Sequence, residues 1–99
     1  MYFFARTQNP RPTFPQDMTP EERIIMQDHI AYWSEKAAKG IAIVFGPVMD
    51  PTGAYGILVA QAKDEVEMSD LIEHDPANNL LHNSIFPMGS AIVGTLHSY

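Results

Sequence analysis

Two residues of the sequence could perform acid–base chemistry, because each is a titratable group where the pattern favours an apolar one. His29 lies in a predicted amphipathic helix, at the edge of its apolar stripe. Asp75, in the step His74-Asp75-Pro76, takes the next stripe position of a second predicted helix. An imidazole group gains and loses a proton near neutral pH, and a carboxylate can orient or charge it. The pair therefore predicts proton transfer, although it names no substrate.

Each of the two residues also has a purely structural interpretation. His29 could be a packed histidine whose ring bonds a backbone carbonyl group. Asp75 faces the negative end of its helix dipole, a mismatch of about 0.3–1 kcal/mol, so a buried carboxylate there needs hydrogen bonds or a cation. Asp75 could equally end the helix as a solvated Asp-Pro turn. The sequence leaves both pairs of interpretations open.

Other kinds of catalytic site find little support. The chain has no cysteine, which excludes thiolate catalysis and cysteine-based zinc sites. His74 and His82 could join Asp75 around a metal ion, but their spacing matches no zinc pattern, so we predict no metal site. Neither a nucleotide-binding glycine loop nor a serine in a triad context is present, and we predict no cofactor.

The helix that carries His29 has clear signals at both ends. Thr19 and Glu22 form a predicted capping box around Pro20, and Gly40 is a typical C-terminal stop. Four apolar residues at helical spacing predict the core stripe: Met26, Ile30, Trp33 and Ala37. A neighbouring row holds His29 at the boundary of the buried face: Glu22, Ile25, His29, Tyr32 and Lys36. In the second helix, which Asp64 opens, the stripe is Met68, Leu71 and Ile72.

Apolar and aromatic runs predict four strands. They cover 2–6, 41–45, 55–62 and a last strand in two parts, 84–86 and 91–96, broken by a bulge or turn. The proline-rich stretch between residues 7 and 18 predicts a loop without helix. The order β-α-β-β-α-β predicts one ferredoxin-like α+β domain over 1–99, with an antiparallel sheet and two helices on one face.

Composition limits the partners of this domain. Its 99 residues carry a net charge of −6 with six Lys and Arg that do not cluster, which disfavours nucleic-acid binding. No apolar run has the length of a membrane span and no signal sequence is recognisable, so we expect a soluble cytoplasmic protein. The strands offer more apolar surface than two helices on one face can cover, which predicts a homodimer through the other sheet face.

Several short motifs together resemble the YciI-like (YCII-related) family. They are 28–33 (Asp-His-Ile-Ala-Tyr-Trp), Lys39-Gly40, 45–48 (Phe-Gly-Pro-Val), 50–56 (Asp-Pro-x-Gly-x-Tyr-Gly), Asp75-Pro76 and, in a longer first loop, 11–14 (Arg-Pro-Thr-Phe). The resemblance implies a dimeric α+β barrel, in which the sheets of two subunits pack face to face. It also implies an active-site cleft near the first helix, with His29 and Asp75 as the matching residues. Where some members have an acidic residue before the glycine that ends this helix, the chain has Ala38-Lys39.

Three functions remain open. The first is a small-molecule enzyme of the isomerase or lyase type, similar to muconolactone-isomerase-like proteins, with His29 and Asp75 as catalytic residues. We expect Arg11, Phe14 and Tyr32 to bind its substrate. The second is a non-catalytic protein of the same fold that binds a small acidic or aromatic metabolite, whose carboxylate Arg6 or Arg11 would pair. The third is an interaction module in which the polar pair is structural.

Overall fold

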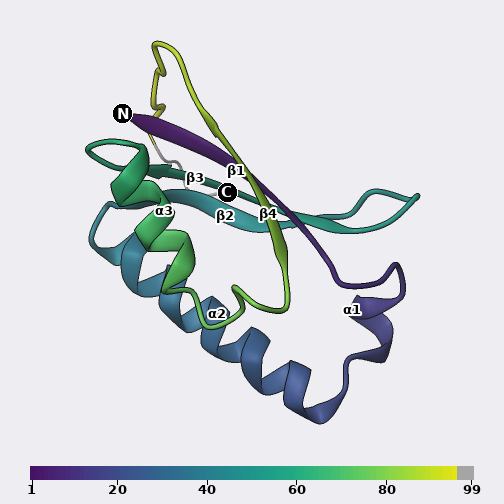
Figure 1. Ribbon diagram of the computed structural model, residues 1–99. Helices are drawn as coiled ribbons and strands as arrows, with labels where there is room; N and C mark the ends of the chain where they lie inside the picture. Colours follow the sequence, from purple (N-terminus) through teal and green to yellow (C-terminus); the bar gives the residue numbers. More distant parts are fainter. Residues whose placement is uncertain (96–99) are drawn as a thin grey trace.

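The computed structural model describes residues 1–95 and forms an α+β domain with a four-stranded antiparallel sheet. Its elements, in chain order, are β1 (Tyr2–Gln8), α1 (Phe14–Asp17), α2 (Pro20–Ala38), β2 (Ala42–Val48), β3 (Tyr55–Gln61), α3 (Glu65–Glu73) and β4 (His82–Pro87). The strands follow the order β2-β3-β1-β4, and α2 and α3 lie on the same face of the sheet (Figure 1). This arrangement confirms the predicted ferredoxin-like fold.

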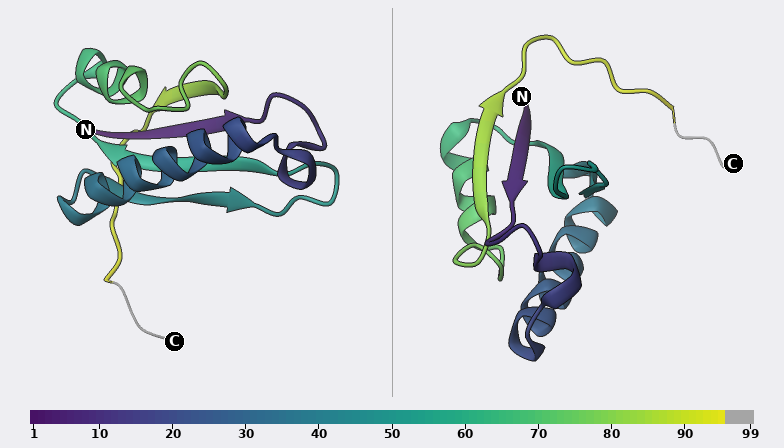
Figure 2. Two further views of the ribbon diagram at one scale, coloured as in Figure 1. Left: turned by 90° about the horizontal axis from the view of Figure 1, so that it is seen from below. Right: turned by 90° about the vertical axis from the view of Figure 1, so that its right-hand side faces the viewer.

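The helix that carries His29 begins as predicted. The backbone N–H of Glu22 donates to Thr19 Oγ1 at 3.2 Å, and the Glu22 carboxylate accepts from the Thr19 N–H at 2.8 Å. The helix ends at Ala38 with Lys39 as its C-cap, and Gly40 has a φ of 75°, a left-handed conformation that costs glycine nothing. These two ends fix the length of α2, which crosses the sheet diagonally (Figure 2).

The core lies between the sheet and the two long helices. Phe3, Ala5 and Thr7 alternate along β1 toward the helices, as a strand with one covered face requires. The main buried cluster joins this face to both helices through Trp33, Met68 and Ile72. In the stripe predicted for α3, Met68 and Ile72 are buried, as expected. Asp75, at the next stripe position, is buried as well.

The buried stripe of α2 differs from the predicted one. Trp33 is buried, but Ile30 is 53% exposed and Ala37 is also exposed. The row of His29 faces inward instead, because the helix is turned so that Trp33 and His29 share the face toward α3. His29 therefore lies nearer the centre of the packed face than the apolar pattern indicates.

Two further predictions about local structure were wrong. The proline-rich loop contains the short helix α1, because Pro15 lies in its first turn, where a missing N–H costs no hydrogen bond. The second part of the last strand does not form over 91–95, where the chain leaves the domain without regular structure (Figure 2). Leu96, the end of that predicted strand, lies outside the described residues. Among residues 1–95, no helix is both long and apolar enough to cross a membrane.

Candidate active site

The carboxylate of Asp75 is the centre of a buried hydrogen-bond network. Its Oδ2 accepts from Trp33 Nε1 at 2.8 Å, and its Oδ1 accepts from the backbone N–H of Ala77 at 2.9 Å. His29 Nδ1 lies 2.7 Å from Oδ2 and 2.9 Å from Oδ1. The side chain of Asp75 is only 3% exposed. The two helices thus bring together the pair that the sequence singles out.

This network determines the protonation of Asp75. Burial alone would raise the pKa of the Asp75 carboxyl, but hydrogen bonds from His29, from the backbone of Ala77 and from Trp33 outweigh it and lower that pKa. Trp33 Nε1 and the Ala77 N–H can only donate, so both oxygens must accept. Asp75 is therefore an ionised acceptor, and three donors compensate for its unfavourable place beyond the C-terminal end of α3.

An ionised Asp75 also fixes the tautomer of His29. Nδ1 can bond the carboxylate only as a donor, so it carries the ring proton. In the neutral ring, Nε2 then has a lone pair and no hydrogen. Within residues 1–95, Nε2 has no hydrogen-bond partner, and His29 lines the large cavity described below. The geometry is that of a base whose orienting group is in place.

Local sequence explains why these groups meet. His29 and Trp33 are four residues apart on α2, so both side chains leave the same face one turn apart. Asp75 follows α3, and Pro76 prevents the helix from continuing. Asp75 then accepts the N–H of Ala77 two residues later, a typical Asx turn. The turn aims the carboxylate back at α2.

A cavity of about 320 Å³ lies between the sheet and the middle of α2. This volume falls within the range of small-molecule sites. Most of its lining is apolar or aromatic, and polar residues are few: Thr7, Asn9, His29, Asp75 and Asn83, with Tyr55 also in contact with it. No lysine or arginine of the described chain lines it. The cavity thus favours an uncharged ligand.

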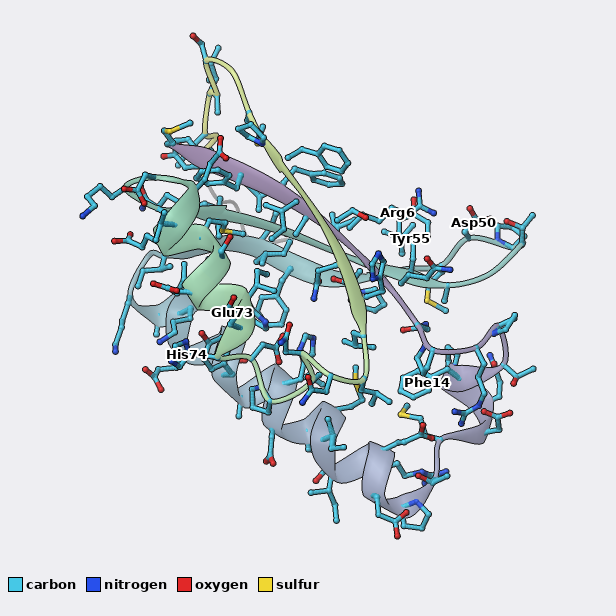
Figure 3. The ribbon with its side chains drawn as sticks, in the orientation of Figure 1. Arg6, Phe14, Asp50, Tyr55, Glu73 and His74 are labelled. Carbon is cyan, nitrogen blue, oxygen red and sulfur yellow. The ribbon has the colours of Figure 1, made fainter. Side chains whose placement is uncertain are left out.

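The three residues predicted to bind substrate lie in different places. Phe14 lines the cavity and is buried against Ala77 and Leu81 (Figure 3). Tyr32 does not line it: the Tyr32 hydroxyl donates to the Leu71 carbonyl at 2.6 Å, which joins α2 to α3. Arg11 does not line it either. Substrate binding by Arg11 and Tyr32 stays a prediction to which this cavity lends no support.

Arg11 instead attaches the first loop to α2. Its Nη1 and Nη2 bond the two carboxylate oxygens of Glu22 at 2.9 and 2.8 Å, and its Nε bonds Asp17 Oδ1 at 2.8 Å. The guanidinium also lies 5.3 Å from the centre of the Phe14 ring. Arg11 thus holds α1, and with it Phe14, over one end of the cavity. Arg6 stacks on Tyr55 near Asp50, on the other side of the sheet (Figure 3).

The Arg11 contact should make the loop sensitive to acid. The hydrogen bonds from Arg11 and Thr19 lower the pKa of Glu22 from 4.5 to about 2. A lowered folded-state pKa contributes stability that is present above 4.5 and is lost as the pH falls toward 2. We expect Arg11→Ala to lower the thermal midpoint at pH 6 and to approach the parent near pH 3. Unfolding curves across this range test the prediction, with Arg23→Ala, next to Glu22 on α2, as a control. A pH-independent difference would contradict it.

Two residues of the candidate site, Trp33 and Asn83, were not predicted from the sequence. Trp33 was assigned to the core stripe, although its indole N–H lies one turn from His29 and could have been recognised as a second donor. Asn83 was assigned to a polar connection. Asn83 lies on the same face of β4 as Ile85 and Pro87, and this period of two is the signal that places it on the helix side.

The fold and site define a ferredoxin-like α+β protein with a His–Asp pair beside an apolar cavity. A family model described as the YCII-related domain matches residues 2–85, and the chain belongs to that family. This confirms the resemblance seen in the motifs. A search of curated proteins gives no match.

A solved structure with a similar fold is that of 5-chloro-2-hydroxyhydroquinone dehydrochlorinase from Burkholderia phenoliruptrix, in complex with 2,5-dihydroxybenzoquinone. The TM-score is 0.68 at 19% sequence identity, and the match covers 92% of this chain and 96% of the other. At this identity the likeness supports the fold.

Proposed function

We propose that the protein is a small-molecule enzyme that transfers protons, of the isomerase or lyase type. The observation that carries the proposal is the place of His29 between a buried carboxylate and a cavity. Asp75 holds the ring through Nδ1, which leaves Nε2 as the atom that takes a proton from the substrate and returns it. Asp75 keeps the ring in place while the proton is held.

The surroundings favour a substrate with an acidic C–H or O–H group in a mainly apolar frame. The aromatic lining residues Phe14, Trp33 and Phe45 offer contacts for a ring, and no cationic side chain of the described residues is present to pair a carboxylate. Proton transfer next to a carbonyl group can move a double bond or expel a leaving group. Both outcomes need the same base, and the dehydrochlorinase of similar fold makes elimination a specific class to test.

An incubation in D₂O tests the proposal. The parent protein and His29→Ala are mixed with 5-chloro-2-hydroxyhydroquinone and a panel of small cyclic ketones and enones, and proton NMR follows exchange and conversion. We expect at least one compound to exchange a C–H proton or react with the parent protein, and His29→Ala to lose this activity. Identical spectra for the two proteins would contradict the proposal.

The non-catalytic alternative makes a different prediction in the same experiment. A binding protein would hold a panel compound in the cavity and release it unchanged after long incubation. The basic residues that this alternative needs are absent from the described cavity lining, since Arg11 bonds Asp17 and Glu22 and Arg6 lies over Tyr55. The purely structural alternative is disfavoured by the cavity beside His29.

We also propose that the working form is a homodimer through the face of the sheet opposite the helices. Strand register places four apolar residues in one row across all four strands of this face: Val44, Val59, Phe4 and Phe86. Val44 on the edge strand β2 is 51% exposed, and Phe86 on the other edge strand, β4, is 55% exposed, although both are large apolar residues. An uncovered apolar row of this kind is typical of an association surface.

Charged substitutions on this row should prevent association. We expect the double variant Val44→Glu, Phe86→Glu to sediment as a monomer at a micromolar concentration at which the parent protein sediments as a dimer. Ile24→Glu is the matched control, because Ile24 is 59% exposed on α2, away from the row. A parent protein that sediments as a compact monomer would contradict the proposed dimer.

A further inference from the structure

One amide group in the cavity has hydrogen-bonding capacity that no contact of the described residues uses. Asn83 Oδ1 accepts from Thr7 Oγ1 at 2.8 Å, which leaves Nδ2 and its two protons. Within residues 1–95, Nδ2 has no hydrogen-bond partner. Every fully buried side-chain nitrogen or oxygen atom of these residues has a hydrogen-bond partner. Because Nδ2 has none, it is not fully buried and remains accessible. Asn83 lines the cavity, to which Nδ2 is an available donor.

The sheet gives this amide a fixed place in the cavity floor. Strand register aligns four residues in one row on the helix side: Asn83, Thr7, Gly56 and Pro47, and all four line the cavity. A side chain at Gly56 would put its Cβ 3.3 Å from that of Thr7, tighter than ordinary contact. Glycine at position 56 thus leaves room for Thr7, whose hydroxyl donates to Asn83 Oδ1. With Oδ1 held in this way, Nδ2 remains available to a ligand.

The other donors near the cavity are less available than the Asn83 amide. Thr7 donates to Asn83, and Trp33 donates to Asp75. Asn9 Nδ2 uses one of its two protons on the Ala54 carbonyl at 3.2 Å. The Tyr55 ring stacks under Arg6, on the side of the sheet away from the helices. Asn83 is therefore the strongest candidate for a neutral donor opposite the base.

We propose that Asn83, positioned by Thr7, binds the carbonyl oxygen of the substrate next to the carbon from which His29 takes a proton. The inference rests on the proposed function. His29 Nε2 takes the proton, the C–H electron pair becomes a C=C bond, and the C=O π pair moves to the oxygen. The resulting enolate oxygen accepts from Asn83 Nδ2, a donor already in place when the negative charge develops. Where a C=C bond is conjugated with the enolate, C=O re-forms, the double bond shifts and a more distant carbon takes the proton. Where the neighbouring β carbon carries a leaving group, C=O re-forms, a new C=C bond forms to that carbon and the group departs with its bonding pair. The substrate class is an uncharged cyclic carbonyl compound.

A pair of ligands with the same shape tests this donor without turnover. Acetophenone and α-methylstyrene differ in having C=O or C=CH₂ at one position. We expect the parent protein to bind acetophenone about threefold to tenfold more tightly, which is the range of one neutral hydrogen bond. We also expect acetophenone to shift the Asn83 side-chain amide signals in ¹H–¹⁵N NMR spectra. Equal affinities, or no binding of acetophenone, would overturn the proposal.

Variants separate this donor from the acid–base pair. Asn83→Leu should abolish the preference for acetophenone, and Asn79→Leu, at an exposed asparagine, should keep it. Thr7→Val should reduce the preference and broaden the Asn83 amide signals. Valine keeps the volume of the threonine side chain but cannot donate to Asn83 Oδ1, so the carboxamide is no longer fixed. His29→Ala should keep the preference even where it stops proton exchange, so the two proposals fail separately. A preference that survives Asn83→Leu would contradict this one.

Discussion

Replacing Asp75 by asparagine is expected to damage stability and activity together. The new side chain has one oxygen and one NH₂ group, but Trp33 and Ala77 donate to the two different oxygens of the native carboxylate. In either orientation the NH₂ group faces a donor, and a buried donor without an acceptor costs about 1–3 kcal/mol. Unfolding in urea should show a decrease in the free energy of unfolding of this size.

The same variant should lose activity because the imidazole is no longer held in one tautomer. The lone pair of Nε2 depends on a proton at Nδ1, which the carboxylate fixes. We expect a decrease in turnover of roughly 10²–10⁴-fold. Asp70→Asn is a suitable control, since Asp70 is an exposed carboxylate on α3. Parent-like turnover in Asp75→Asn would contradict the role of Asp75.

The stability difference between Asp75→Asn and the parent protein should depend on pH. The folded state lowers the pKa of the Asp75 carboxyl below its ordinary 3.8. Its contribution to stability is therefore complete above that value and is lost as the pH falls through the lower folded-state pKa. The two unfolding curves should converge in acid. Curves that separate further at low pH would show that Asp75 is not held as an ion.

Replacing His29 by alanine is expected to have the second large effect, mainly on activity. Removal of the base should lower turnover by roughly 10²–10⁴-fold. Asp75 keeps its bonds from Trp33 and Ala77, so the loss of stability should be smaller than in Asp75→Asn. Steady-state kinetics on any compound converted in the D₂O experiment, together with thermal unfolding, measure both quantities.

A histidine outside the site provides the control for this substitution. His74 lies at the C-terminal end of α3 (Figure 3), is exposed, and bonds the Asp70 carbonyl oxygen through Nδ1. We expect His74→Ala to retain full turnover. Equal losses in His74→Ala and His29→Ala would mean that the decrease comes from general destabilisation of the helices.

The order of elements could be predicted because strong local signals fix it. Thr19, Glu22 and Gly40 determine the ends of α2 through bonds between near neighbours in the chain. The rotation of α2 could not be predicted in the same way. A stripe through Ile30 and Ala37 is more apolar than the row through His29, yet the second row faces inward, because the choice depends on the contact between Trp33 and Asp75 across 42 residues.

The two residues of the candidate site could be singled out from the sequence, but their contact and their surroundings could not. His29 and Asp75 stood out because polar groups interrupt apolar patterns, and the structure places them 2.7 Å apart. The cavity depends on how three elements pack, including the loop that Arg11 attaches to α2. The partner of Asn83, Thr7, lies 76 residues away on another strand. No local pattern joins residues at that separation.

The tautomer of His29 is the most direct test of the central claim, that Asp75 holds the ring with a bare Nε2 available to the cavity. Two-bond ¹H–¹⁵N correlation spectra of the parent protein, recorded at a pH where the ring is neutral, distinguish the two ring nitrogens. The geometry predicts the proton on Nδ1 and an unprotonated Nε2. A ring with its proton on Nε2 and none on Nδ1 would contradict the account.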